Sequence, residues 1–147
     1  MHFHLPIEVN RLVDVMTNGQ TSKQTMDLVQ AFIEQVDLIP IRIEKESPGY
    51  VFNAMLIGFM REALRLWSRG IASKEDIDRV WTTIMGVAGG PFVSMDYVGV
   101  DTVWRIIQGI AESTQDSETA VAAAQLKNLV DDGRLGMKSG KGFYDYT

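Results

Sequence analysis

The stretch 47–70 constrains the fold of this chain more than any other part of the sequence. Over residues 50–67, apolar side chains fall on nearly every face of a helix, and a helix that is apolar all round is expected to be buried. Pro48 suits the first turn of such a helix and Gly70 suits its end. The apolar run is too short to span a membrane, because four polar residues interrupt it: Asn53, Arg61, Glu62 and Arg65. We therefore expect the central helix of a soluble, mainly α-helical domain.

Asn53 is the unusual residue of this helix, because an amide among apolar neighbours needs hydrogen-bond partners. Two interpretations are open from composition alone. The amide either bonds to nearby backbone groups and serves the structure, or it points at a ligand. Composition by itself favours the structural role.

The bulk composition narrows the classes of function. With 14 basic and 19 acidic residues, the chain has a formal net charge of −5, which argues against nucleic acid or an anionic membrane as a partner. There is no cysteine, so disulfides, thiolate metal sites and a cysteine nucleophile are excluded. The first residues lack the basic and apolar regions of a secretory signal peptide. We therefore expect a cytoplasmic protein, and at 147 residues one domain with its own core is the default.

The first third of the chain reads as a strand, a helix and a second strand. Residues 9–16 and 39–44 alternate between apolar and polar side chains, as half-buried strands do. Between them, a cap at Thr21 or Ser22 predicts a helix that runs to about Val36. Such a unit is too small to stand alone, since two strands make a marginal sheet.

Four further helices are predicted after the central one. Their expected ranges are 74–85 with a cap at Ser73, 92–97, 102–112 with a cap at Asp101, and 118–132. The tail then combines glycines with Phe143, Tyr144 and Tyr146. Because a disordered tail rarely carries such large apolar surfaces, we expect the glycines to form turns that fold these aromatic residues back onto the core.

Both histidines of the chain, His2 and His4, lie near the N-terminus and are two residues apart. On a strand they would face the same side. A metal site needs a third ligand, and no neighbouring cluster in the sequence offers one, so no metal site is expected. The sequence also contains no GxxxxGK[ST] loop and no GxGxxG turn after a strand, so no phosphate or dinucleotide site is expected.

Four ordered motifs resemble the C-terminal domain of the 3-hydroxyacyl-CoA dehydrogenase family. They are SPGYVFNAML, the segment 62–78, GPFVSMDYVGVDT and GRLGMKSGKGFYDY. At the N-terminus, MHFHLP resembles the family's His-Phe-Phe-Asn-Pro segment, and RLVDVM resembles its Lys-Leu-Val-Glu-Val-Ile segment. The resemblance thus covers most of the chain.

This resemblance implies a fold and a division into domains. Residues 47–147 are expected to form a helical domain like the C-terminal domain of 6-phosphogluconate dehydrogenase, used for substrate binding and dimerisation. Residues 1–46 are expected to be the last strand–helix–strand of a truncated dinucleotide-binding (Rossmann) domain. The family's Gly-rich NAD fingerprint would lie before this region. NAD is therefore the cofactor of a full-length family enzyme, and none is expected for this chain alone.

The resemblance also implies the site residues. The family's catalytic histidine falls on His2, its acidic partner on Asp14 and its substrate-contacting asparagine on Asn53. The histidine takes a proton from the C3 hydroxyl while hydride leaves to NAD, and a nearby carboxylate fixes its tautomer. In this chain Leu5 and Ala54 replace an asparagine and an arginine of the family. Asp14 is one methylene shorter than the family's glutamate, so we expect contact with His2 to need a backbone shift of about an ångström, and misplacement on that scale costs ~100-fold in rate.

The resulting hypothesis is the substrate-binding and dimerisation part of an NAD-dependent 3-hydroxyacyl-CoA or 3-hydroxybutyryl-CoA dehydrogenase of fatty-acid metabolism (β-oxidation). This part is expected to be inactive without its NAD-binding domain, to take an acyl-CoA-type substrate and to form a homodimer. Three alternatives stay open. They are a non-enzymatic helical dimerisation module, a stand-alone binder of acyl-CoA or carboxylates, and a dehydrogenase of a related 3-hydroxy acid.

Overall fold

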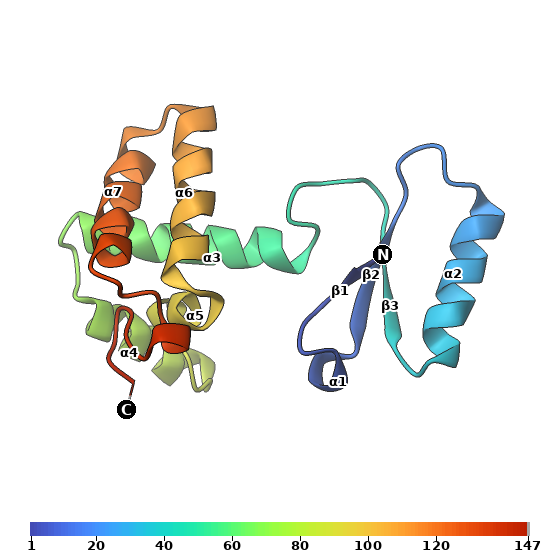
Figure 1. Ribbon diagram of the computed structural model, residues 1–147, viewed down its shortest axis with the longest axis horizontal. Helices are drawn as coiled ribbons and strands as arrows, with labels where there is room; N and C mark the ends of the chain where they lie inside the picture. Colours follow the sequence, from blue (N-terminus) through green and yellow to red (C-terminus); the bar gives the residue numbers. More distant parts are fainter. Residues whose placement is uncertain (147) are drawn as a thin grey trace. The chain divides into compact units, whose positions relative to one another are not determined.

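The computed structural model describes residues 1–146, and most of its elements are helices (Figure 1). The chain divides into two compact units, one formed by Met1–Met55 and one that begins at Leu56. The expectation of a mainly α-helical chain with a small β-sheet at its start is confirmed. Among the described residues, no helix combines the length and the apolar character that crossing a membrane requires.

The first unit is built around a three-stranded sheet in the order β1-β2-β3 (Figure 1). β1 (His2–Phe3) pairs antiparallel with β2 (Leu12–Met16), and β2 pairs parallel with β3 (Ile39–Ile43). The short helix α1 (Ile7–Asn10) connects β1 to β2, and α2 (Lys23–Gln35) makes the crossover from β2 to β3. A parallel pair joined by a helix is the βαβ unit of nucleotide-binding sheets.

The β2–α2–β3 unit confirms the predicted strand, helix and strand. Ser22 caps α2 by accepting a hydrogen bond from the backbone N–H of Thr25. The buried side chains of Met26 and Ile33 on α2 pack with those of Val13 and Val15 on β2. The first strand was predicted to begin too early, at residue 9. It begins at Leu12 because the preceding residues form the turn of α1.

α3 (Phe52–Ser68) is the predicted central helix, but its start and its burial differ from the expectation. It does not begin at Pro48, because Gly49 and Tyr50 adopt left-handed φ angles of 77° and 51°. The buried residues of α3 are Met60, Ala63 and Leu64, and they lie on one face of its second half. Several apolar residues near its start are exposed, including Met55 at 63%. The expectation of a helix buried on every side is therefore wrong for this chain.

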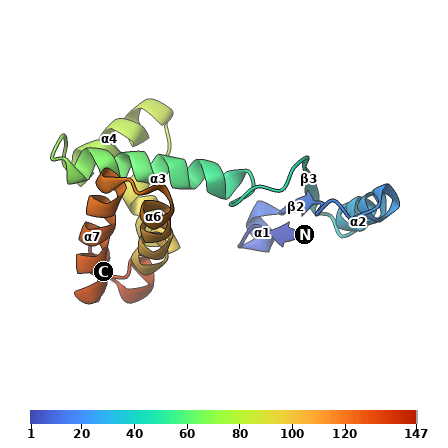
Figure 2. The same cartoon turned by 90° about the horizontal axis from the view of Figure 1, so that it is seen from above.

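Four helices and a 3₁₀ turn complete the second unit. They are α4 (Lys74–Met85), α5 (Pro91–Val98), α6 (Val100–Thr114), α7 (Ser117–Asp131) and η1 (Met137–Ser139). The cap of α4 at Ser73 is confirmed, since its hydroxyl accepts from the N–H of Asp76. Asp101 is not the cap of α6, because the helix begins at Val100, two residues earlier than predicted, and Gly99 takes the cap position. Figure 2 shows α6 and α7 side by side as a helical hairpin.

The core of the second unit collects side chains from α3, α5, α6 and α7, together with Phe143 of the tail. Three aromatic rings meet in it nearly edge to face. The ring centroids of Phe92 and Phe143 are 4.8 Å apart, and Trp67 lies 5.4 Å from Phe143 and 5.9 Å from Phe92. Such pairs add about 0.5–1.5 kcal/mol each beyond the apolar area that they bury. The predicted return of the aromatic tail to the core is thus confirmed for Phe143.

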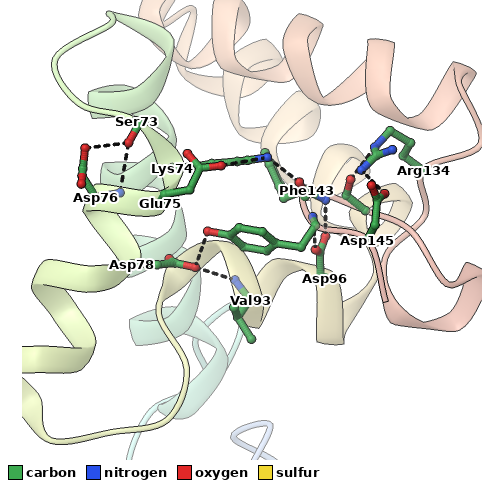
Figure 3. A network of polar contacts seen from close by, with 12 residues as sticks. Ser73, Lys74, Glu75, Asp76, Asp78, Val93, Asp96, Arg134, Phe143 and Asp145 are labelled. Carbon is green, nitrogen blue, oxygen red and sulfur yellow. Dashed lines mark hydrogen bonds and ion pairs between the residues drawn. The ribbon is translucent and has the colours of Figure 1, made fainter. Parts of the chain in front are cut away.

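Two buried aspartates hold this tail in place (Figure 3). Asp78 of α4 accepts hydrogen bonds from the backbone N–H groups of Phe92 and Val93 and from the hydroxyl of Tyr144 at 3.0 Å. A carboxylate at this position also suits the positive end of the α5 dipole. The carboxylate of Asp78 therefore connects α4, the start of α5 and the tail.

Asp96 of α5 makes the second set of contacts to the tail. Its carboxylate accepts from the backbone N–H groups of Phe143 at 2.7 Å and Tyr144 at 2.9 Å, and from the hydroxyl of Tyr146 at 2.7 Å. Burial and the hydrogen bond to Asp96 raise the pKa of Tyr146 above its ordinary value. Burial, with the neighbouring charge of Asp78, does the same to the pKa of Tyr144.

Candidate active site

His2 and Asp14 form the centre of the candidate site in the first unit. They are direct partners in the antiparallel register of β1 and β2. The Nδ1 atom of His2 lies 3.0 Å from Oδ2 of Asp14, so the shorter aspartate reaches the histidine. The Asp14 side chain is 2% exposed, whereas that of His2 is 32% exposed. A buried carboxylate thus orients a partly exposed imidazole.

His4 belongs to the same cluster, which the sequence alone did not predict. It lies two residues from His2 on the same face, and its Nε2 atom is 2.9 Å from the same Oδ2 of Asp14. The expectation that no third metal ligand lies near the two histidines is wrong, because β2 brings Asp14 to both of them. The sequence does not specify how β1 and β2 pair, and this register is what places Asp14 near both histidines. Residues directly opposite or diagonal on one face of two antiparallel strands are neighbours.

Aromatic residues just before α3 and at its first position lie against the two imidazoles. The ring centroid of Tyr50 is 4.8 Å from that of His2, and the ring of Phe52 meets that of His4 edge-on at 5.9 Å. Tyr50 takes a left-handed φ angle of 51°, which is uncommon for a large side chain and recurs at functional sites. Tyr50 before α3 therefore packs onto His2, and Phe52 at the start of α3 packs onto His4.

A pocket of about 290 Å³ opens beside this cluster. His4, Asn10 and Asp14 supply its polar lining, and the apolar lining consists of Leu12, Ile41, Val51, Phe52 and Met55. A mostly apolar pocket with a few convergent polar groups is the usual form of a small-molecule site. It combines an apolar wall with polar groups of His4, Asn10 and Asp14.

Asn53 does not belong to the cluster formed by His2, His4 and Asp14. It is a half-buried residue in the first turn of α3, next to Phe52, which lines the pocket. Over residues 1–146, no hydrogen bond joins its side chain to His2 or Asp14. The structure thus brings together two of the three site residues implied by the resemblance and leaves Asn53 beside them.

The His2–Asp14 pair is suited to accept a proton. A neutral imidazole that donates Nδ1–H to a carboxylate keeps Nε2 free as a base, and the carboxylate stabilises the imidazolium that forms. A βαβ unit that carries such a pair and is followed by a helical unit is typical of dehydrogenases that combine a dinucleotide-binding sheet with a helical domain.

Comparison with known proteins specifies this class. The family model for the 3-hydroxyacyl-CoA dehydrogenase C-terminal domain matches residues 49–146, and the model for the NAD-binding domain of the same enzymes matches residues 1–47. The chain belongs to the 3-hydroxyacyl-CoA dehydrogenase family.

Individual relatives agree with this assignment. The human mitochondrial hydroxyacyl-coenzyme A dehydrogenase is 36% identical over 99% of this chain and 46% of that protein. A diketoreductase structure, reported for catalysis of dicarbonyl compounds, aligns with a TM-score of 0.88 and 34% identity over 99% of this chain and 50% of its own. The structure of (S)-3-hydroxybutyryl-CoA dehydrogenase from Ralstonia eutropha aligns with a TM-score of 0.85 and 33% identity, over 100% of this chain and 51% of that protein. The chain spans about half the length of these relatives.

Proposed function

We propose that this chain is the substrate-binding and assembly half of an NAD-dependent 3-hydroxyacyl-CoA dehydrogenase of fatty-acid β-oxidation. The observation that carries the proposal is the 3.0 Å contact between His2 and the buried Asp14 beside an apolar pocket. The names of the human and Ralstonia eutropha relatives support a CoA thioester as the substrate. We also propose that the helical substrate domain begins near residue 47, after the end of the nucleotide-binding sheet.

In this proposal, Nε2 of His2 accepts the proton of the substrate's C3 hydroxyl. Asp14 holds the ring by Nδ1 and balances the charge that the ring acquires, and such general base catalysis contributes about 10²–10⁴-fold to rate. NAD, when bound in a complete enzyme, supplies the hydride acceptor. Asn53 is proposed to contact the substrate from the first turn of α3. The apolar pocket wall, including Ile41 and Met55, accommodates the acyl part.

The residues of this chain do not fit the dinucleotide itself. The sequence has no GxGxxG turn, which would place a pyrophosphate at a helix N-terminus. We therefore propose that the chain alone does not bind NAD and is inactive until joined to an NAD-binding half. Calorimetric titration of the 147-residue chain with NAD tests this directly. A micromolar affinity would contradict it.

The decisive test of the function joins the chain to the NAD-binding half of a relative. The fused protein is expected to reduce NAD with 3-hydroxybutyryl-CoA as substrate, and the 147-residue chain by itself is not. A fused protein that binds NAD but turns over neither this substrate nor longer acyl-CoA homologues would favour a non-enzymatic assembly module or a stand-alone binder.

The similarity to the diketoreductase supports a second candidate substrate class. Its structure concerns dicarbonyl compounds, which need no CoA group. The same fused protein distinguishes the two substrate classes. The measurement compares kcat/KM for the reduction of the 3-ketoacyl-CoA that corresponds to 3-hydroxybutyryl-CoA with kcat/KM for the reduction of a free dicarbonyl compound, both with NADH. A higher value for the free compound would assign a related hydroxy acid as the substrate.

We further propose that the second unit forms a homodimer through an apolar face on α3 and α4. A groove of about 410 Å³ lies on this face, lined mainly by apolar side chains that include Leu66, Ile77 and Val80. The rings of Phe59 and Trp81 are 4.3 Å apart beside it. Contiguous exposed apolar surface of this kind usually marks an interface. The face comprises Phe59, Leu66, Ile77, Val80, Trp81, Ile84 and Met85.

A further inference from the structure

His4 gives this site a chemistry that the proposed dehydrogenase reaction does not use. The family motif has phenylalanine where this chain has His4. Its imidazole makes a second contact to Asp14, so two imidazole nitrogens converge on one carboxylate oxygen at 2.9 and 3.0 Å. The three potential ligand atoms, one from each residue, lie within 4.8 Å of one another. Base catalysis by His2 needs only one of these contacts.

We propose that His2, His4 and Asp14 form a binding site for a divalent transition-metal ion of the Zn²⁺ class. Two imidazoles and one carboxylate are the protein ligands of zinc sites that keep a fourth position open. Imidazole nitrogen is also a good ligand for nickel and copper, whereas magnesium and calcium prefer oxygen. The atoms that already meet are Nδ1 of His2, Nε2 of His4 and a carboxylate oxygen of Asp14, and we assign these three as the ligands.

The spacing of these atoms is near what such an ion needs. Metal–ligand bonds of about 2.0–2.2 Å in a tetrahedral site put ligand atoms roughly 3.3 Å apart. The two nitrogen–oxygen distances of 3.0 and 2.9 Å must therefore lengthen by a few tenths of an ångström. His2 can make this movement, because its side chain is partly exposed and lies on a strand of two residues.

The surroundings of Asp14 favour a cation at this point. Its side chain is 2% exposed, and the apolar side chains of Leu12 and Ile41 line the same pocket. A buried carboxylate in an apolar environment gains from a positive partner, since bulk water screens the charge weakly there. His4 and Asp14 also line the pocket, so an ion held between them is reachable from solvent.

Metal binding has a defined consequence for the base. An ion on Nδ1 of His2 leaves the single proton of the neutral ring on Nε2, which is the nitrogen that must accept a proton in the proposed reaction. The ion also takes the carboxylate that orients the ring. The metal-bound form is therefore an inactive form of the base, and this consequence rests on the proposed function. The binding of the ion itself does not depend on the proposed function.

Binding is tested on the 147-residue chain by titration with ZnCl₂ in a non-chelating buffer. Calorimetry is expected to give one equivalent of bound Zn²⁺. Because His2 and His4 are the only histidines, all imidazole proton NMR signals report on this site. Both rings are expected to shift with the same stoichiometry. These measurements need no dehydrogenase activity, so their failure would leave the proposed function untouched, and the reverse also holds.

Three variants make the test specific. His4→Phe and Asp14→Asn should each weaken Zn²⁺ binding by at least about tenfold, since losing even an outer-shell partner typically costs 10–100-fold. His4→Gln keeps an N–H donor for Asp14 while removing the imidazole ligand, so it replaces His4→Phe if that variant fails to fold. Asp37→Asn is the control, because this carboxylate is exposed in the same unit and outside the cluster.

The proposal is overturned if the chain binds no Zn²⁺, or if only the His2 ring shifts. It is equally overturned if Asp14→Asn and the folded His4 variant, either His4→Phe or His4→Gln, both bind Zn²⁺ as tightly as the parent chain. That last result would show that neither His4 nor Asp14 binds the ion.

Discussion

Asp14 lies directly opposite His2 across the β1–β2 pair, and its Oδ2 atom is 3.0 Å from Nδ1 of the imidazole. The register sets this relationship, so two residues twelve positions apart in sequence meet as cross-strand neighbours. Their contact is the basis of the first prediction.

In the protein fused to an NAD-binding half, His2→Ala should lower kcat by about 10²–10⁴-fold, because the substrate hydroxyl loses its proton acceptor. The measurement is NADH formation at saturating 3-hydroxybutyryl-CoA. Lys23→Ala serves as a control, since this residue is exposed on α2. A kcat for His2→Ala within a factor of a few of the parent would assign the base elsewhere.

Asn53→Ala should act mainly on KM in the same protein. The residue lies in the first turn of α3 beside the pocket, and no hydrogen bond in residues 1–146 ties it to the His2–Asp14 pair. Loss of a substrate hydrogen bond is expected to weaken binding by about 0.5–1.5 kcal/mol, or up to roughly tenfold in KM. A fall in kcat as large as that of His2→Ala, with KM unchanged, would instead show a catalytic role.

Gly142→Ala should destabilise the second unit strongly, because a methyl group at this position overlaps the carboxylate of Asp96 and the backbone of Gly136. Disturbing the buried Asp96 leaves donors unpaired at about 1–3 kcal/mol each. Gly109→Ala is the matched control. It lies in α6 with no atom near a new methyl group and should raise stability by about 0.5–1 kcal/mol. Urea unfolding followed by circular dichroism measures both, and equal midpoints would contradict the account.

The stability of the chain should fall as the pH rises above about 10, the ordinary pKa of tyrosine. The folded state raises the pKa values of Tyr144 and Tyr146 through burial and the nearby Asp78 and Asp96. Above the ordinary pKa, the unfolded chain releases protons that the folded chain retains, so the free energy of unfolding declines. Below it, the full stabilisation is present.

Urea unfolding at a series of pH values between about 9 and 11 tests this linkage. Tyr144→Phe and Tyr146→Phe should each give a shallower decline with pH and a lower stability at neutral pH, by about 1.5–3 kcal/mol for a hydrogen bond to a charged group. Tyr97→Phe is the control, because Tyr97 is 68% exposed. An unchanged pH slope in both tail variants would contradict the prediction.

Ile84→Glu should dissociate the proposed homodimer. Ile84 is 76% exposed on α4, and a carboxylate there would lose its hydration in an apolar interface. Val121→Glu is the control, since Val121 is 52% exposed on α7, outside the apolar face. Light scattering at micromolar concentration should give twice the 16.4 kDa of one chain for the parent and the control, and one chain mass for Ile84→Glu. A parent protein of single-chain mass at every concentration would rule out the dimer.

Local sequence signals determined most of the elements of this protein. Ser22 and Ser73 start helices because a hydroxyl can satisfy a free N–H within a few residues. The alternation at Ile39, Ile41 and Ile43 specified β3, because the side chains of a strand alternate between its faces. The motifs were also sufficient to place the chain in its family.

Only the tertiary structure decided which distant residues meet. The β1–β2 register brings Asp14 to both His2 and His4, and the packing of the tail brings Tyr144 to Asp78 and Tyr146 to Asp96. A carboxylate's partners depend on the three-dimensional path of the chain, which spacing along the sequence does not specify. The burial of α3 depended on its neighbours for the same reason, since an apolar face is covered only where another element packs against it.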